Sequence, residues 1–309
     1  MLLSGKAAAE RVRGTQTIVG QMGWVFTRPS LTALEVLWRW VFGAPLLVAC
    51  YVEVQKIFTL LPPESTGLSD FDITNPWMSA VKVAVAWDMY RPHVVEVMRR
   101  FGPLAALAWI VLSGIGRNLV LRRMERGLPF RPLAMIVLQT VWLAVLMLTG
   151  WAWWISINWA AATHIGNGSE PDLVGYATWA IFLSLGFFSL WAMVSWWVAI
   201  APMLLLLEGR SVMGSLWQSL KLGKAFTNKL MEINMVMGIV KLCLVVLAMV
   251  FSAVMLPFAS QIGASTLHEE WLVVSVFYFV ASDFFHVARL KGFIEFWHVF
   301  REPAQPANP

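Results

Sequence analysis

The sequence has 309 residues, of which 59% are hydrophobic and 13% charged, with a formal net charge of +5. A soluble domain carries about 25% charged residues, so this composition excludes an ordinary soluble globular protein and indicates a chain that lies mostly in lipid. The 18 Trp residues, against four Tyr, make the chain Trp-rich. Indole rings favour the headgroup zone of a bilayer, although they also pack between helices.

Six apolar stretches are long enough to cross a hydrocarbon core of about 30 Å at a rise of about 1.5 Å per residue. They are residues 37–58, 101–121, 132–161, 174–207, 233–259 and 271–290. The expected fold is therefore all-α, a polytopic membrane protein with six transmembrane helices. Its expected parts are a cytoplasmic N-terminal segment (1–30) without a cleavable signal peptide, a six-helix membrane domain (31–300) and a disordered C-terminal tail (301–309).

The distribution of Lys and Arg predicts the orientation, because short basic loops stay in the cytoplasm. The loops after the second and fourth spans are basic; they contain Arg122, Arg123, Arg126 and Arg131, and Arg210, Lys221, Lys224 and Lys229. Loops 163–172 and 263–270 contain acids and neither Lys nor Arg, whereas loop 59–100 carries both signs. We expect a protein of the bacterial cytoplasmic (inner) membrane with both termini in the cytoplasm.

Two further stretches predict interfacial amphipathic helices. The first begins with Pro76 after Asn75 and is expected to end at Pro92. The second covers residues 211–229 and places Met213 and Trp217 on one surface. The basic residues near it are expected to contact anionic lipid headgroups: Arg210, Lys221, Lys224 and Lys229. The alternative for this stretch is a cytoplasmic hairpin packed on the bundle.

Ionisable residues inside the last two spans are expensive in lipid and require partners. Asp283 and Lys241 each lie about 12 Å from the predicted inner membrane face, counted along their helices. A short loop joins these spans, so Lys241 can meet Asp283, with His286 one turn away on nearly the same face. Arg117 and Asn118 near the end of the second span are alternative partners. The predicted buried polar cluster is therefore Lys241, Asp283, His286 and Arg117.

Two interpretations of this cluster stay open. Intramembrane ionisable groups often form ion or proton relays, whereas a buried pair can also fix the register of neighbouring helices. No catalytic residue, metal site or cofactor is expected. His286 is the only histidine within a predicted span, and His164 and His268 come from separate loops without the spacing of metal ligands.

Two segments resemble a known family. The stretch APMLLLLEGRSVMGSLWQSLKLG (201–223) and the stretch FYFVASDFFHVARLKGFIEF (277–296) resemble the six-helix membrane domain of glycerophosphoryl diester phosphodiesterases and related bacterial integral membrane proteins. The resemblance implies the order of the spans. In those phosphodiesterases the hydrolysis belongs to a separate soluble domain, so the resemblance assigns no catalytic residue to this sequence.

The expected function is that of a non-enzymatic integral membrane protein: an accessory subunit, a scaffold, or a protein that binds a lipid or a partner. Its expected partners are membrane lipids with anionic headgroups on the cytoplasmic face, with a protein partner or a second copy of the chain left open, and no nucleic acid. The alternative is a small permease or proton-coupled transporter that uses Asp283, His286 and Lys241.

Overall fold

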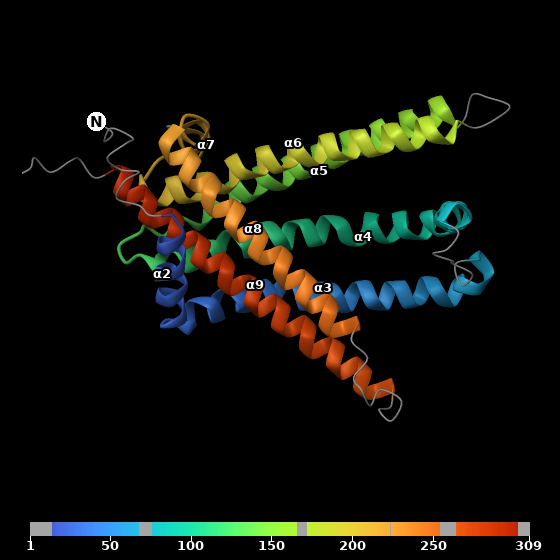
Figure 1. Ribbon diagram of the computed structural model, residues 1–309, viewed down its shortest axis with the longest axis horizontal. Helices are drawn as coiled ribbons and strands as arrows, with labels where there is room; N and C mark the ends of the chain where they lie inside the picture. The colour runs from blue at the N-terminus through green and yellow to red at the C-terminus, as the bar shows by residue number, and fades with distance from the viewer. Residues whose placement is uncertain (1–13, 68–75, 166–171, 223, 254–263, 302–309) are drawn as a thin grey trace, which may run out of the picture. The chain divides into compact units, whose positions relative to one another are not determined.

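The computed structural model describes residues 14–67, 76–165, 172–222, 224–253 and 264–301, and in this part of the chain all regular secondary structure is helical (Figure 1). The helices are α2 (Gly14–Phe26), α3 (Pro29–Leu60), the short 3-10 helix η1 (Pro63–Thr66), α4 (Pro76–Met124), α5 (Pro132–His164), α6 (Leu173–Leu207), α7 (Val212–Leu220), α8 (Lys224–Ala253) and α9 (Ala264–Arg301). Residues 302–309, most of the predicted tail, lie outside the described part.

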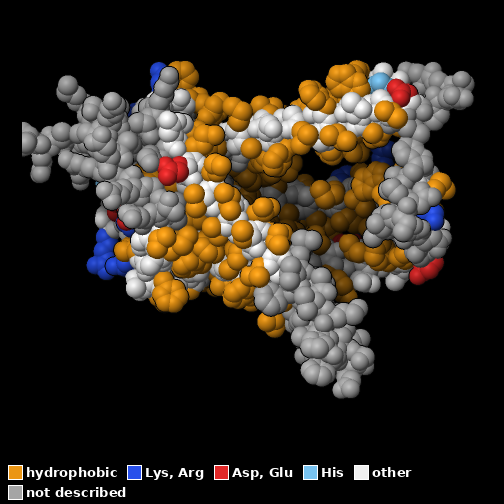
Figure 2. Space-filling model, in the orientation of Figure 1, with side chains coloured by type: hydrophobic (Ala, Val, Ile, Leu, Met, Phe, Trp, Pro, Cys, Tyr) orange, Lys and Arg blue, Asp and Glu red, His pale blue; other side chains and the backbone are white. Residues whose placement is uncertain are grey.

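Within the described residues, six helices are long and apolar enough to cross a membrane, which confirms the predicted all-α, multi-pass class. The candidate spans are Pro29–Leu60, Lys82–Met124, Pro132–His164, Val174–Leu207, Leu230–Ala248 and Leu272–Val299. Many large apolar side chains on them are exposed, such as Phe182 and Phe188 of α6 at 69% each. Figure 2 shows hydrophobic side chains along the length of the α5–α6 pair, as a lipid-facing surface requires.

The first predicted interfacial helix has a different end from the one expected. Residues 76–92 do form a helix, but it does not stop at Pro92: α4 continues through Pro92 and Pro103 as one helix of 49 residues. A proline removes one backbone hydrogen bond, and a membrane helix tolerates this loss because its remaining backbone groups have no better partners in lipid. The second predicted helix, 211–229, is not one helix: α7 begins after its N-cap Ser211 and ends at Leu220, and α8 begins at Lys224.

The chain divides into two compact units, Met1–Leu37 with Gly114–Pro309, and Trp38–Ser113. The smaller unit contains the C-terminal part of α3, η1 and the N-terminal part of α4. Its core contains Ile57, Ala86 and Tyr90. The Tyr90 hydroxyl donates to the Leu61 carbonyl at 3.0 Å and lies 3.4 Å from the Thr66 hydroxyl, which ties α4 to the segment after α3.

The larger unit is built from helix pairs that are close in sequence. α5 packs against α6, α8 packs against α9, and α7 folds back onto α6. Figure 1 shows α8 and α9 side by side along much of their length. Tight pairing of α5 and α6 is supported by indole contacts across them: Trp142 lies 5.4 Å from Trp191 and Trp159 lies 5.8 Å from Trp179, both edge-on.

The N-terminal segment contains a helix that the sequence analysis did not identify. α2 packs on α9 and α8, with Gln21 and Val25, one turn apart, both buried. The Gln21 amide nitrogen donates to the Glu295 carboxylate at 2.6 Å, and the Lys291 ammonium lies 4.7 Å from the Trp24 ring. These contacts are possible because α9 continues past residue 290, the predicted end of the last span, to Arg301.

Candidate functional site

A buried polar network in the larger unit connects three helices. Glu35 of α3 is completely buried, and its Oε1 lies 3.6 Å from Nε2 of His286 on α9. One turn further along α9, the Arg289 guanidinium lies 2.8 Å from His286 Nδ1. Arg289 also donates to the side-chain oxygen of Asn234 on α8 at 3.5 Å. A carboxylate, an imidazole, a guanidinium and an amide therefore follow one another across α3, α9 and α8.

The contacts determine which ring nitrogen of His286 carries a proton. A guanidinium can only donate, so Nδ1 of His286 accepts from Arg289. The ring proton of the neutral imidazole then lies on Nε2, which faces the Glu35 carboxylate. His286 thus accepts a hydrogen bond from the Arg289 guanidinium, while its Nε2 lies 3.6 Å from the Glu35 carboxylate, beyond hydrogen-bond distance. Because Glu35 lies six residues after Pro29, the network sits about 9 Å along the axis of α3.

Two more polar side chains are buried in this unit. Asp283 lies one turn before His286 on α9 and is 4% exposed. Asn118 of α4 is completely buried, and neither its amide nitrogen nor its amide oxygen has a hydrogen-bond partner among the described residues. A buried amide normally has hydrogen-bond partners because an unsatisfied one costs free energy.

The predicted cluster residues lie in these helices, but the structure adds partners that the sequence did not indicate. Lys241 is half-buried on α8 and Arg117 is half-buried on α4. The packing of α8 against α9 brings the helices of Lys241 and Asp283 together, and a direct Lys241–Asp283 pair stays a prediction. His286 contacts Glu35 and Arg289.

Glu35 was missed because the predicted first span begins at residue 37. α3 begins eight residues earlier, at Pro29. A signal was present in the sequence: Leu31, Glu35 and Trp38 follow helical spacing, and all three are buried in the structure. An acid in the middle of an otherwise apolar helical stripe indicates a buried carboxylate that needs a partner.

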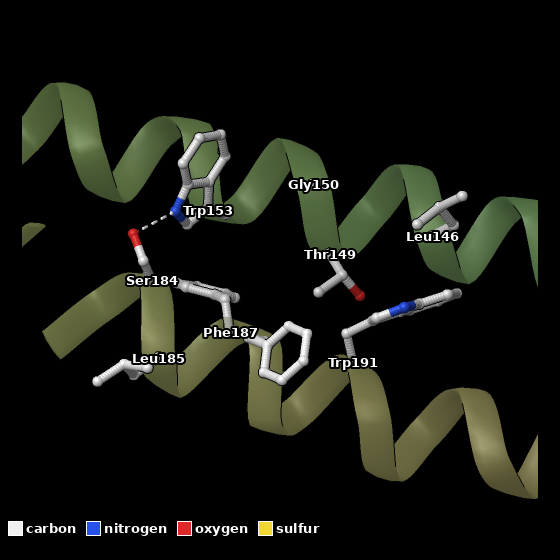
Figure 3. Close-up of a pocket in the computed structure, with 9 residues that line it drawn as sticks. Leu146, Thr149, Gly150, Trp153, Ser184, Leu185, Phe187 and Trp191 are labelled. Atoms are coloured by element: carbon white, nitrogen blue, oxygen red, sulfur yellow. Dashed lines mark hydrogen bonds between the residues drawn. The ribbon is translucent and has the colours of Figure 1, made fainter. Parts of the chain in front are cut away.

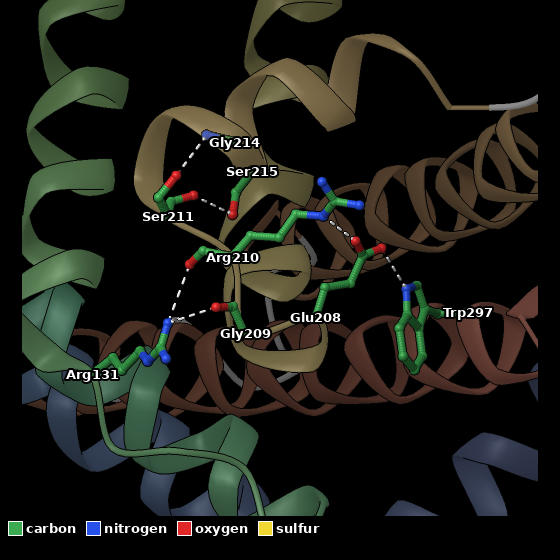
Figure 4. Close-up of polar contacts among 8 residues, drawn as sticks. All are labelled: Arg131, Glu208, Gly209, Arg210, Ser211, Gly214, Ser215 and Trp297. Carbon is green, nitrogen blue, oxygen red and sulfur yellow. Dashed lines mark hydrogen bonds and ion pairs between the residues drawn. The ribbon is translucent and has the colours of Figure 1, made fainter.

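A second group of polar contacts holds the corner between α6 and α7 (Figure 4). The Glu208 carboxylate, whose side chain is 4% exposed, pairs with Arg210 and accepts from the Trp297 indole of α9 at 3.3 Å. Arg131 donates to the carbonyls of Gly209 and Arg210 at 3.0 and 3.2 Å. Gly209 has a φ of +63°, a conformation that favours glycine. These contacts explain how residues 208–211, Glu-Gly-Arg-Ser, form the corner that follows α6.

The four basic residues predicted to contact lipid headgroups differ in their exposure and in their neighbours. Arg210 is paired with Glu208, although its side chain is 41% exposed. Lys221 is exposed, and its ammonium lies 4.6 Å from the Trp217 ring. Lys224 and Lys229 lie in α8, and their side chains are outside the described part of the structure.

An apolar groove of about 450 Å³ runs between α5 and α6 (Figure 3). Trp153, Phe187 and Trp191 line it, and the Trp153 indole donates to the Ser184 hydroxyl at 3.0 Å. The described residues that line this groove are all uncharged. The serine satisfies the indole N–H in a region where water is scarce, so the groove offers shape to a hydrocarbon chain without a charge to select a headgroup.

The α5–α6 pair ends in a small polar contact outside the spans. His164 Nδ1 lies 3.0 Å from the Asp172 carboxylate, which also accepts from the backbone N–H of Gly175 at 2.9 Å as the N-cap of α6. The Gly175 N–H, and then His164, hold the pKa of Asp172 below its ordinary value of 3.8. Among the described residues, no group of three His, Cys, Asp or Glu is placed to hold a metal ion.

The fold and its six apolar helices define a multi-pass membrane protein of the all-α class. No family model, curated protein or solved structure matches the sequence.

Proposed function

We propose that this chain is a non-enzymatic protein of the bacterial inner membrane, with both termini in the cytoplasm, that binds anionic phospholipid at its cytoplasmic face. The observation that carries the proposal is the polarity of α7. Ser215 and Ser219 are buried, while Met213, Trp217 and Leu220 are 74%, 59% and 50% exposed. α7 therefore turns its serines toward the protein and its apolar side chains away from it, which is the reverse of a helix in a soluble protein.

The serines of α7 do not need a polar environment. The Ser215 hydroxyl donates to the Ser211 carbonyl at 2.9 Å and the Ser219 hydroxyl donates to the Leu216 carbonyl at 2.7 Å, so both are satisfied by their own helix. Their small size lets α7 pack closely on α6. The outward apolar side chains then suit the boundary between headgroups and acyl chains, beside the exposed Lys221.

Support for the non-enzymatic part comes from the buried network. His286 and Glu35 carry the groups that acid–base chemistry uses, but they are 5% and 0% exposed and contact each other. The resemblance of residues 201–223 to the membrane domain of glycerophosphoryl diester phosphodiesterases supports the same topology and adds no catalytic group. An accessory or scaffold role that depends on lipid agrees with both observations.

The depth of α7 in a bilayer tests the proposal. In a variant with Cys50→Ser and Cys243→Ser, a spin label at Met213→Cys should be accessible to oxygen and protected from a water-soluble nickel complex in nanodiscs that contain phosphatidylglycerol. A label at Gln218→Cys, which is half-buried on α7, is the control for attachment to this helix. A label at position 213 that stays equally accessible to nickel with and without phosphatidylglycerol would refute an interfacial α7.

A proton-coupled carrier is the second candidate, favoured by the continuous contacts from Glu35 through His286 to Arg289. A proton can move between the Glu35 carboxylate and His286 Nε2, whereas the Arg289 guanidinium stays protonated and holds Nδ1 in place. Proteoliposomes with an internal pH dye and an imposed membrane potential test it. A proton flux that Glu35→Gln abolishes supports the carrier, whereas a flux equal to that of protein-free vesicles rejects it.

A further inference from the structure

A concave pocket of about 380 Å³ lies at the C-terminal end of α4, and its lining is unusually basic. The lining residues are Leu34, Leu119, Arg122, Arg123, Arg126 and Gly127. Ligand sites in proteins have volumes of roughly 300–1,000 Å³. Three arginines and two leucines therefore line a hollow large enough for a ligand.

The charges of this pocket have few partners in the structure. Among the described residues, Arg123 and Arg126 form no ion pair with an acid. The nearby acid Glu125 contacts His298 instead, with its two oxygens 2.9 and 3.1 Å from Nε2. Like charges placed together repel unless an anion is present, so the pocket is electrostatically suited to a negatively charged ligand.

One of the arginines is held in place. The Nε of Arg122 donates to the Leu128 carbonyl at 3.1 Å, and its guanidinium lies 5.2 Å from the Phe130 ring. These contacts use one of the five N–H groups of the guanidinium. Its remaining N–H groups are thus positioned without further loss of side-chain freedom, which favours binding of an anion.

A structural explanation accounts for only part of this arrangement. Basic residues in the last turn of a helix stabilise its negative end, and Arg122 and Arg123 are in the last turn of α4. Arg126 lies beyond Met124, the last residue of α4, just before the chain turns at Gly127 with a φ of +106°. The helix dipole does not require an arginine there, whereas a three-arginine anion site does.

We infer that Arg122, Arg123 and Arg126 bind the phosphate of an anionic phospholipid or a soluble phosphate ester. The planar guanidinium matches phosphate oxygens with paired hydrogen bonds. Leu34 and Leu119 form an apolar wall beside the charges, which suits a phosphate attached to a hydrocarbon chain. This inference deepens the proposed function, because it rests on lipid binding at the cytoplasmic face and names a headgroup site separate from α7.

The test compares two double variants of the full chain on the same helix. Arg123→Ala with Arg126→Ala removes two pocket charges, and Arg99→Ala with Arg100→Ala removes two exposed charges from another part of α4. Native mass spectrometry of the purified protein measures the dissociation constant for phosphatidylglycerol. Calorimetry with inorganic phosphate, on the protein in phosphatidylcholine nanodiscs, measures binding of soluble phosphate. Arg122 is left unchanged because it holds the loop to Leu128.

We expect the pocket variant to weaken phosphatidylglycerol binding by more than about tenfold and the control variant to leave it unchanged. Arg123→Lys with Arg126→Lys should weaken phosphatidylglycerol binding by an intermediate amount. Lysine keeps the positive charge but lacks the planar guanidinium that forms paired hydrogen bonds with phosphate oxygens. If the pocket variant loses binding of inorganic phosphate but keeps binding of phosphatidylglycerol, the site binds a soluble phosphate ester and not a phospholipid. Unchanged binding of both anions in the pocket variant would overturn the inference, and the spin label on α7 still tests the proposed function independently.

Discussion

His286 is the residue on which the buried network depends, because it contacts both the acid of α3 and the base of α9. Removing it leaves the completely buried Glu35 without the imidazole that lies 3.6 Å away. A buried charge that loses its partner is destabilising, although measured polar contacts between membrane helices are modest. The network therefore contributes little to the free energy of unfolding. Its main effect is to disfavour other packing arrangements of α3, α8 and α9, in which these polar groups would lose their contacts.

We expect His286→Ala to lower the free energy of unfolding by roughly 1–2 kcal/mol. Glu35→Gln combined with His286→Ala should cost less than the sum of the single changes, because both substitutions remove the same contact between the two side chains. Unfolding in mixed micelles with increasing denaturing detergent measures these values. His298→Ala is the matched control, since the His298 side chain is 44% exposed and should change stability little. Strictly additive losses would show that Glu35 and His286 do not interact.

Asp172 predicts a dependence of stability on pH at the end of the α5–α6 pair. Its pKa is below 3.8 in the folded protein because its carboxylate accepts from the Gly175 N–H and contacts His164. The unfolded chain binds the proton more tightly, so this contribution is complete above pH 3.8 and is lost as the pH falls below it through the folded pKa.

Asp172→Ala should therefore lower the apparent melting temperature of the detergent-purified protein at pH 6, and this deficit should shrink when the pH falls below 3.8. Ser211→Ala removes a neutral N-cap, that of α7, and its deficit should not change across the same range. A deficit of Asp172→Ala that is constant with pH would contradict the role assigned to the carboxylate.

The helices differ in how well their limits can be predicted. α6 ends at Leu207, as expected, because a charged residue and a glycine follow an apolar run. The helix that begins at Pro76 was expected to end at Pro92, but α4 continues through this residue. The effect of an internal proline depends on whether the backbone has other hydrogen-bond partners, and a local sequence pattern does not show this. The α2 helix was missed because its buried face is defined by α9, more than 250 residues away in the sequence.

Close approach of α4 and α5 depends on one glycine. A Cβ on Gly114 would lie 2.7 Å from the Ile136 Cγ1, 2.9 Å from its backbone nitrogen and 3.0 Å from its Cα. Backbone atoms cannot move aside cheaply, so Gly114→Ala should destabilise the protein by roughly 1–3 kcal/mol in the same mixed-micelle assay. Gly150→Ala, which meets no atom within 4 Å, should be neutral or slightly stabilising. Equal effects of the two substitutions would exclude close packing at Gly114.

For the whole molecule, composition and the lengths of apolar runs were sufficient to predict the class and the number of spans. The partners of the buried charges were not predictable in the same way. Glu35 and His286 meet only because separate helices pack together, and no spacing in the sequence records that packing. Arg122, Arg123 and Arg126 at the end of α4 were interpreted as an orientation signal alone, since their common pocket with Leu34 depends on where the start of α3 lies.

The orientation of the whole chain gives the last prediction. α5 has 33 residues, which at about 1.5 Å per residue exceeds the thickness of the hydrocarbon core, so its two ends face opposite sides of the membrane. The arginines before Pro132 predict that its N-terminal end faces the cytoplasm. In a variant with Cys50→Ser and Cys243→Ser, a membrane-impermeant maleimide should label Thr163→Cys in intact spheroplasts. It should label Lys221→Cys, exposed after α7, only after lysis. The opposite pattern would invert the topology and would move both α7 and the arginine pocket to the outer face.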